Sequence, residues 1–170
     1  MGARILIALA ANGALLLLAC QQALALNPRR VLTQYTHTVW TQEHGLPQDT
    51  IRAITQTKDG YLWLGTDQGL AQFDGYDFTI FSKESGSLPS NSVGALFAGS
   101  NGSLWIGTPG GLTLYRDRKF TTYTLKDGLA DPFINSIAED RSGALWMIAG
   151  TCLNRFQDGK FTNYRLGPEE

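Results

Sequence analysis

Hydrophobic and polar positions alternate along this chain in short runs, and the order of the runs repeats. An apolar stretch centred on tryptophan occurs three times, at Trp63, Trp105 and Trp146, with spacings of 42 and 41 residues. Around each tryptophan, glycine stands three residues before it, leucine seven residues after it, and aromatic residues 10, 15 and 18 residues after it. A period of about 40 to 45 residues is typical of stacked or ring-forming repeats. The hydrophobic pattern therefore predicts a repeat protein.

Each repeat unit divides into four short runs separated by turn signals. The predicted strands of the first unit are 50–56, 61–66, 70–73 and 76–82. Gly60 ends the first turn, where a hairpin favours a residue that accepts a positive φ. The second run is apolar at successive positions, which indicates burial on both faces. Four short antiparallel strands with tight turns predict an all-β fold, in which each unit is one β-propeller blade.

The repeat also predicts how blades pack together. A single blade has two apolar faces that it cannot cover, so the repeated tryptophans are expected to fill the gap between blades. Glycines two residues after the first two tryptophans are expected where a neighbouring backbone comes too close for a side chain. These structural positions are Trp63, Trp105, Trp146, Gly65 and Gly107.

The third unit departs from the pattern in its second turn. Ile148 stands where Gly65 and Gly107 stand, and Cys152 stands where the first two units have Gly69 and Gly111. We expect this turn to differ in shape. Cys152 is the sole cysteine after residue 25, so no disulfide within the exported chain is expected.

The blades do not account for the whole chain. The predicted organisation is a signal peptide at 1–25, a linker and stray propeller strand at 26–43, blades at 44–82, 86–124 and 127–165, and a tail at 166–170. The stray strand is predicted because Trp40 precedes Leu46 by six residues, as Tyr123 precedes Leu129. Propellers close with about four to eight blades, so three blades form an incomplete propeller. We expect an N-terminal fragment of a longer protein, with further blades, or self-association.

The sequence details of the units resemble a known family. Gly-Leu-Pro at 45–47, Asp-Gly-Tyr-Leu-Trp-Leu-Gly-Thr at 59–66 and Phe-Asp-Gly at 73–75 are similar to the two-component regulator propeller repeat. The similarity runs from 44 to 165, and the second unit departs from it at Asp117 and Arg118. The resemblance implies the periplasmic sensor domain of a bacterial hybrid sensor kinase or related signalling protein.

That resemblance carries further expectations. In such proteins the propeller is followed by another β domain, a transmembrane helix and a cytoplasmic output domain. A ligand, such as an oligosaccharide or another envelope solute, is expected to shift the arrangement of two propellers in a dimer. Any kinase or cyclase activity then belongs to sequence beyond these residues, and this chain is expected to bind rather than catalyse.

The N-terminal residues predict export. Arg4 precedes an apolar run at 5–19 that is short for a membrane span, and Ala23-Leu24-Ala25 has the form of a signal peptidase site. Cleavage there leaves a periplasmic protein. Lipidation of Cys20 is the alternative, with an uncleaved anchor as a third interpretation. Removing residues 1–25 changes the formal net charge from −1 to −2, and the absence of a basic run argues against a nucleic-acid partner.

The chain offers few residues for chemistry. His37 and His44 are the only histidines, and neither stands in a metal-ligand spacing, so no metal, cofactor or catalytic residue is predicted. Aspartates beside glycine turns are assigned to the turns. The predicted ligand contacts are Trp40, Glu43, His44 and Asp49, which surround the Gly-Leu-Pro segment.

Two other functions remain open from the sequence. One is a propeller enzyme acting on polysaccharide, which needs a cluster of acids, bases or metal ligands. The other is an interaction scaffold held at the outer membrane through Cys20.

Overall fold

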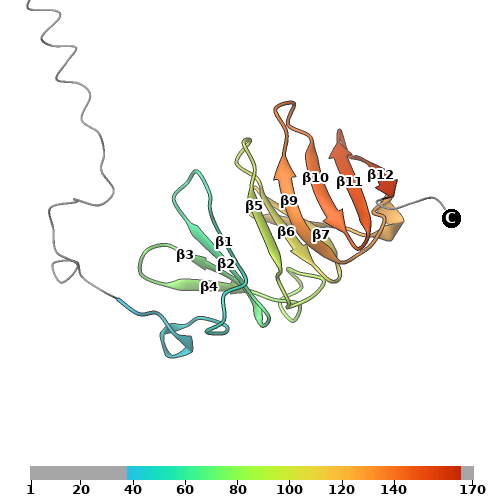
Figure 1. Ribbon diagram of the computed structural model, residues 1–170. Helices are drawn as coiled ribbons and strands as arrows, with labels where there is room; N and C mark the ends of the chain where they lie inside the picture. The colour runs from blue at the N-terminus through green and yellow to red at the C-terminus, as the bar shows by residue number, and fades with distance from the viewer. Residues whose placement is uncertain (1–37, 166–170) are drawn as a thin grey trace, which may run out of the picture. The chain divides into compact units, whose positions relative to one another are not determined.

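A computed structural model describes residues 38–165, and twelve strands within them form three antiparallel sheets of four strands (Figure 1). Blade 1 consists of β1 (Ala53–Gln56), β2 (Leu62–Thr66), β3 (Gly69–Phe73) and β4 (Phe78–Phe81). Blade 2 consists of β5 (Ala95–Ala98), β6 (Leu104–Thr108), β7 (Gly111–Arg116) and β8 (Lys119–Tyr123). Blade 3 consists of β9 (Ile134–Glu139), β10 (Leu145–Ala149), β11 (Cys152–Gln157) and β12 (Lys160–Arg165). The predicted all-β propeller blades are confirmed.

The segments predicted at 1–25 and 166–170, and residues 26–37 of the segment predicted at 26–43, lie outside the described residues. Residues 38–43, the described part of the predicted stray strand, are not a strand: 38–41 have no regular structure, and Gln42–His44 form the 3-10 helix η2. A strand needs a partner for its backbone groups, and each described sheet already has four strands.

Trp40 nevertheless keeps the position of a fourth-strand aromatic. Its ring lies 5.1 Å from that of Phe73 and 6.4 Å from that of Phe78. In the same way, Phe81 of blade 1 lies 5.0 Å from Phe120 of blade 2. The sequence alignment of Trp40 with the end of a blade therefore corresponds to real packing, although the backbone around it is not in a sheet.

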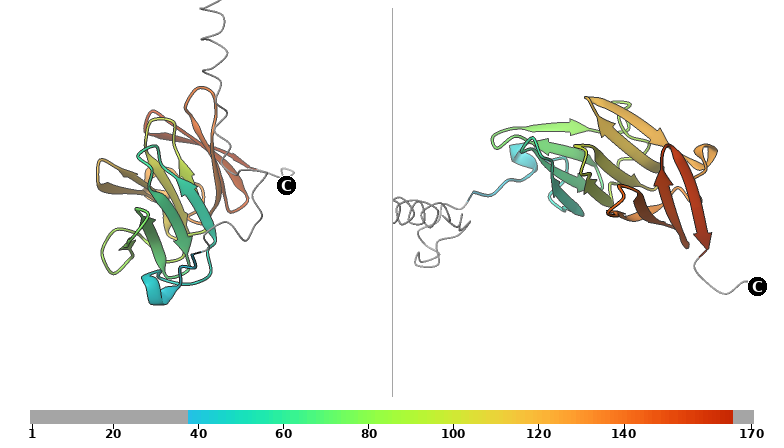
Figure 2. Two further views of the ribbon diagram at one scale, coloured as in Figure 1. Left: turned by 90° about the vertical axis from the view of Figure 1, so that its left-hand side faces the viewer. Right: turned by 90° about the horizontal axis from the view of Figure 1, so that it is seen from above.

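The repeated tryptophans lie in the joints between blades. Trp63 is 1% exposed, and its ring lies 5.0 Å from that of Tyr115 in the next blade. Trp105 repeats this contact with Phe156 of blade 3, at 5.5 Å. Two buried apolar clusters follow, one at each joint. The view from above in Figure 2 shows the three sheets following one another in chain order.

Two glycines permit the close approach of the blades. A Cβ at Gly65 would lie 2.7 Å from Cγ1 of Val93, and a Cβ at Gly107 would lie 2.8 Å from Cγ2 of Ile134. Both neighbours begin the following blade. The structural role predicted for these glycines follows directly from the two distances, because real Cβ atoms do not approach so closely.

The second turn of blade 3 differs in shape, as its sequence indicates: the positive φ falls at Gly150, whereas in blades 1 and 2 it falls at Gly69 and Gly111. In addition, the pairing of β10 with β9 changes register between Ile148 and Ala149. Trp146, on the face that would meet a following blade, is half-buried and stacks on Tyr164 at 5.8 Å. This face has no neighbour among the described residues.

Candidate functional site

The first strands of neighbouring blades contact one another, and a hollow of about 490 Å³ lies where these strands begin. Its wall comes from the segments that enter each blade and from the turns between second and third strands. The lining residues are Thr50, Ile51, Arg52, Asp67, Ser92, Gly94, Pro109, Phe133, Ile134 and Asn135. We call this the axial hollow.

An ion pair dominates the polar side of the axial hollow. Arg52 donates from Nε to Oδ1 of Asp67 at 2.7 Å and from Nη2 to Oδ2 at 2.6 Å. The hydroxyl of Ser92, which enters blade 2, donates to Oδ1 of Asp67 at 2.9 Å. The Asp67 carboxylate therefore ties the start of blade 1 to the start of blade 2.

These hydrogen bonds fix the charge of both groups. The bond from Arg52 is the main cause that lowers the pKa of Asp67, and the bond from Ser92 adds to it. The same pairing raises the pKa of Arg52. Both groups stay charged at neutral pH, so the pair is suited to hydrogen bonding a hydroxyl-bearing ligand and unsuited to proton transfer.

The ion pair belongs to blade 1 alone. The positions that correspond to Arg52 and Asp67 hold Gly94 and Pro109 in blade 2, and Asn135 and Gly150 in blade 3. The blade architecture does not require the pair. The Arg52 side chain is 53% exposed, which leaves part of its guanidinium open to solvent.

The four residues predicted to contact a ligand lie elsewhere, in the loop that leads into blade 1. Trp40 packs on blade 1 as described. His44 Nδ1 accepts a hydrogen bond from the Thr41 amide at 3.2 Å, and Asp49 Oδ1 accepts one from the Gln42 amide at 2.7 Å. Glu43 is exposed in the first turn of η2. Three of the four thus have contacts that hold the loop together, and ligand contact by any of them stays a prediction.

The sequence pattern predicts only a turn role for Asp67, which stands two residues before Gly69, and no role for Arg52. The signal that could have found them is variation within the repeat: 11 residues before and four residues after the tryptophan, an Arg and an Asp replace the uncharged residues of the other units. The turn assignment holds for Asp74, which accepts hydrogen bonds from the amides of Tyr76 and Asp77, both at 2.8 Å.

Over residues 38–165, no group of three or more His, Cys, Asp or Glu side chains is arranged to hold a metal ion. None of the helices in this part of the chain is long and apolar enough to cross a membrane.

Four-stranded antiparallel sheets that stack through repeated aromatic joints, with their first strands gathered around one hollow, define a β-propeller. Two segments of the sequence match a family model. Residues 45–68 and 87–110 match the two component regulator propeller.

Solved structures show the same fold. The extracellular domain of a putative hybrid two component system from B. thetaiotaomicron is 24% identical, with a TM-score of 0.70 over 76% of this chain and 19% of its own. A second such domain from the same organism is 23% identical, with a TM-score of 0.58, over 71% of this chain and 19% of that one. A virginiamycin B lyase from Staphylococcus aureus is 21% identical, with a TM-score of 0.56, over 68% of this chain and 41% of the lyase.

The chain thus spans about a fifth of the length of the two-component domains that it resembles. No curated protein sequence matches it.

Proposed function

We propose that this chain is an exported, ligand-sensing propeller module of a two-component signal transduction protein and that it binds without catalysing. The observation that supports this most directly is the match of two blade segments to the two component regulator propeller. The likeness to extracellular domains of two-component systems is consistent with it, although at these identities that likeness concerns the fold.

The binding role agrees with the chemistry of the axial hollow. Its charged residues are paired with each other, and neither has a pKa shifted toward neutral pH as a general acid or base needs. The alternative of a polysaccharide-cleaving propeller enzyme has in its favour the likeness to a lyase, which is again a likeness of fold. Incubating the purified protein with a panel of glycans tests it, because product formation would exclude the non-catalytic proposal.

Export is the second part of the proposal. The apolar run at 5–19 and the Ala-Leu-Ala sequence at 23–25 support a cleaved signal peptide. Mass spectrometry of the mature N-terminus is expected to find Leu26. A lipidated Cys20 would instead support the scaffold at the outer membrane, and an intact Met1 in the cytoplasm would contradict export.

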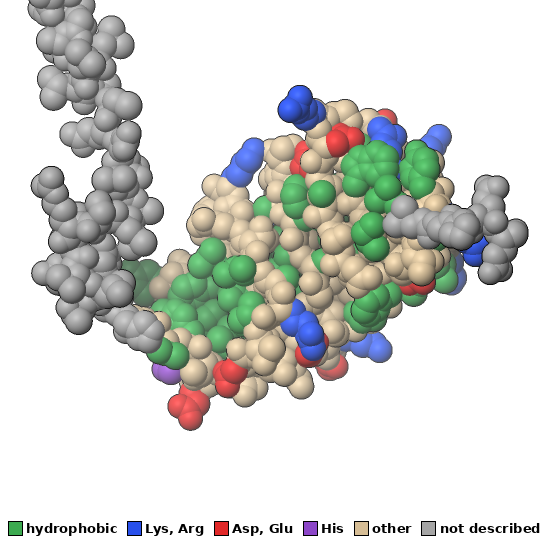
Figure 3. All heavy atoms as spheres, in the orientation of Figure 1, with side chains coloured by type: hydrophobic (Ala, Val, Ile, Leu, Met, Phe, Trp, Pro, Cys, Tyr) green, Lys and Arg blue, Asp and Glu red, His purple; other side chains and the backbone are tan. Residues whose placement is uncertain are grey.

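The open faces of the outer blades support the further partners that we propose. Leu104 and Ile106 of blade 2 are fully buried against blade 1, whereas Leu62 and Leu64, at the same positions of blade 1, are half-buried. Figure 3 shows hydrophobic side chains gathered over blade 1 and again beside β12. Further blades or a second copy would cover these faces.

The signalling role is tested in the host cell. Deleting the gene and profiling transcripts during growth on different polysaccharides should show at least one response that disappears with the deletion and returns on complementation. If no transcript depends on the gene under any of these conditions, the signalling proposal fails.

A further inference from the structure

Two crevices lie at equivalent places, one in each joint between blades. The crevice between blades 1 and 2 has a volume of about 650 Å³, and the one between blades 2 and 3 has about 350 Å³. Each is floored by the aromatic residues of its joint and rimmed by the hairpin between the third and fourth strands of the following blade. Volumes of this size are those of small-molecule sites.

The differences between the two crevices show which side chains are not needed for packing one blade on the next. The positions of Tyr61 and Gln72 in the larger crevice are occupied by Ser103 and Leu114 in the smaller one. At the rim, Arg116 and Arg118 correspond to Gln157 and Gly159. Arg116 also lines the smaller crevice, but at the equivalent positions that crevice has no counterpart of Tyr61 or Arg118, so blade packing does not require these two side chains.

The backbone at Arg118 strengthens this conclusion. Arg118 has φ +60° in the tight turn between β7 and β8, where Gly159 of blade 3 has φ +76°. Among residues 38–165 the other non-glycine residues with positive φ are Asp117 and Asp158, and aspartate tolerates this region better than arginine. A side chain kept at a strained position that a glycine could fill points to a role for that side chain.

The charges of the rim leave Arg118 available for a ligand. Arg116 Nε lies 3.8 Å from Asp117 Oδ2, and Asp59 accepts a hydrogen bond from the Thr57 hydroxyl at 2.5 Å. No ion pair is formed by Arg118 with a carboxylate of the described residues. Tyr61, on the opposite side of the crevice, is 37% exposed and presents an aromatic ring to solvent.

We propose that the crevice between blades 1 and 2 binds an acidic oligosaccharide. A sugar ring stacks on Tyr61, the Gln72 amide and Thr79 hydroxyl bond its hydroxyl groups, and its carboxylate pairs with Arg118. The inference rests on the proposed sensing function and names the chemistry of the ligand.

The test measures binding by calorimetry with the mature chain that begins at Leu26. The probes are an oligogalacturonate and a neutral cello-oligosaccharide of equal length. We expect the oligogalacturonate to bind, with an affinity that falls as salt is added, and the neutral probe to bind at least about tenfold more weakly.

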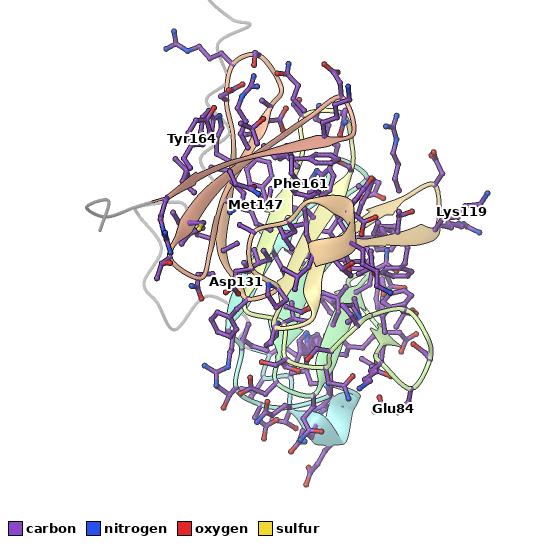
Figure 4. The ribbon with its side chains drawn as sticks, turned by 90° about the vertical axis from the view of Figure 1, so that its right-hand side faces the viewer. Glu84, Lys119, Asp131, Met147, Phe161 and Tyr164 are labelled. Atoms are coloured by element: carbon purple, nitrogen blue, oxygen red, sulfur yellow. The ribbon has the colours of Figure 1, made fainter. Side chains whose placement is uncertain are left out.

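The variants replace crevice residues with those that the equivalent crevice already holds. Arg118→Gly is expected to raise the thermal unfolding midpoint, because it relieves the positive φ, and to weaken oligogalacturonate binding about tenfold or more. Tyr61→Ser is expected to weaken binding of the same probe. Lys119→Ala removes a neighbouring positive charge that projects from the hairpin tip outside the crevice, and is expected to leave binding within about twofold (Figure 4).

Three results would overturn the inference: no binding of the oligogalacturonate, equal binding of the neutral probe, or equal losses from Arg118→Gly and Lys119→Ala. The last would indicate general attraction to a basic hairpin. The transcript test of signalling does not depend on this ligand. If the protein signals but does not bind the oligogalacturonate, the inference about the ligand is wrong and the proposed function stands.

Discussion

Gly107 lies where two blades come closest, and its lack of a side chain is a packing requirement. A Cβ there would be 2.8 Å from Ile134 and 3.0 Å from Ala95. Gly107→Ala is therefore expected to lower the free energy of unfolding by about 1–3 kcal/mol through overpacking. Urea unfolding measures the loss. Gly94→Ala is the matched control, because the nearest atom to its Cβ is 3.9 Å away; an equal loss in both variants would contradict the steric explanation.

Asp140 makes stability depend on acid pH. Hydrogen bonds from Ser142, and next from Trp146, lower its pKa well below the usual range. A folded-state pKa below the unfolded value means that the stabilisation is fully present above about pH 4 and is lost as pH falls below that. Asp140→Asn is expected to flatten the decline of stability between about pH 4 and pH 2, as followed by urea unfolding at each pH. An unchanged slope would exclude this carboxylate as a contributor.

At the scale of elements, the connections into blades 1 and 3 contain the same kind of capped 3-10 turn. Helices η2 and η3 (Leu125–Asp127) both follow a threonine N-cap and end at a glycine with φ near +100°. In η3, Asp127 Oδ2 accepts from the Thr124 amide at 2.8 Å. Asp127→Ala is expected to cost about 0.5–2 kcal/mol in thermal or urea unfolding, and Asp127→Asn should retain most of the stability because its oxygen still accepts. Equal losses of stability in the two variants would show that the hydrogen bond accepted by the Asp127 side chain does not stabilise the turn.

At the scale of the molecule, the middle blade is covered on both faces and the outer blades on one. Ile106 is fully buried, whereas Leu64, its counterpart in blade 1, is half-buried. Ile106→Ala is expected to cost about 2–5 kcal/mol and Leu64→Ala clearly less. Amide hydrogen exchange should be slowest in β6 and β7. Slower exchange in blade 1 or blade 3 would indicate that their open faces are covered in solution.

The sequence predicted the blades well because their packing repeats. Trp63 and Gly65 contact the same positions of the following blade as Trp105 and Gly107 do, so the repeat itself indicates their role. The prediction failed where the side-chain pattern of a strand occurs without a partner strand. Residues 38–43 have the side-chain pattern of a fourth strand but no strand to pair with, and pairing is not encoded locally.

The candidate sites were missed because their residues come together only in the folded chain. Arg52 and Asp67 are 15 residues apart and meet only because β1 and β2 are antiparallel. Arg118 looks like an ordinary surface arginine until its backbone conformation is known. The sequence units already differ at these positions, but only the folded blades show which of the differing residues come together.

The position of Trp40 has a practical consequence for choosing the ends of a protein fragment. The aromatic ring that packs on Phe73 of blade 1 comes from a residue before the first strand of that blade, just as Phe81 of blade 1 packs on Phe120 of blade 2. The sequence repeat and the packing unit are therefore offset by one strand. A fragment of blade 1 that begins at the repeat boundary, residue 44, lacks Trp40 and exposes Phe73 and Phe78 to solvent. A fragment that begins before Thr38 keeps Trp40 packed on both rings.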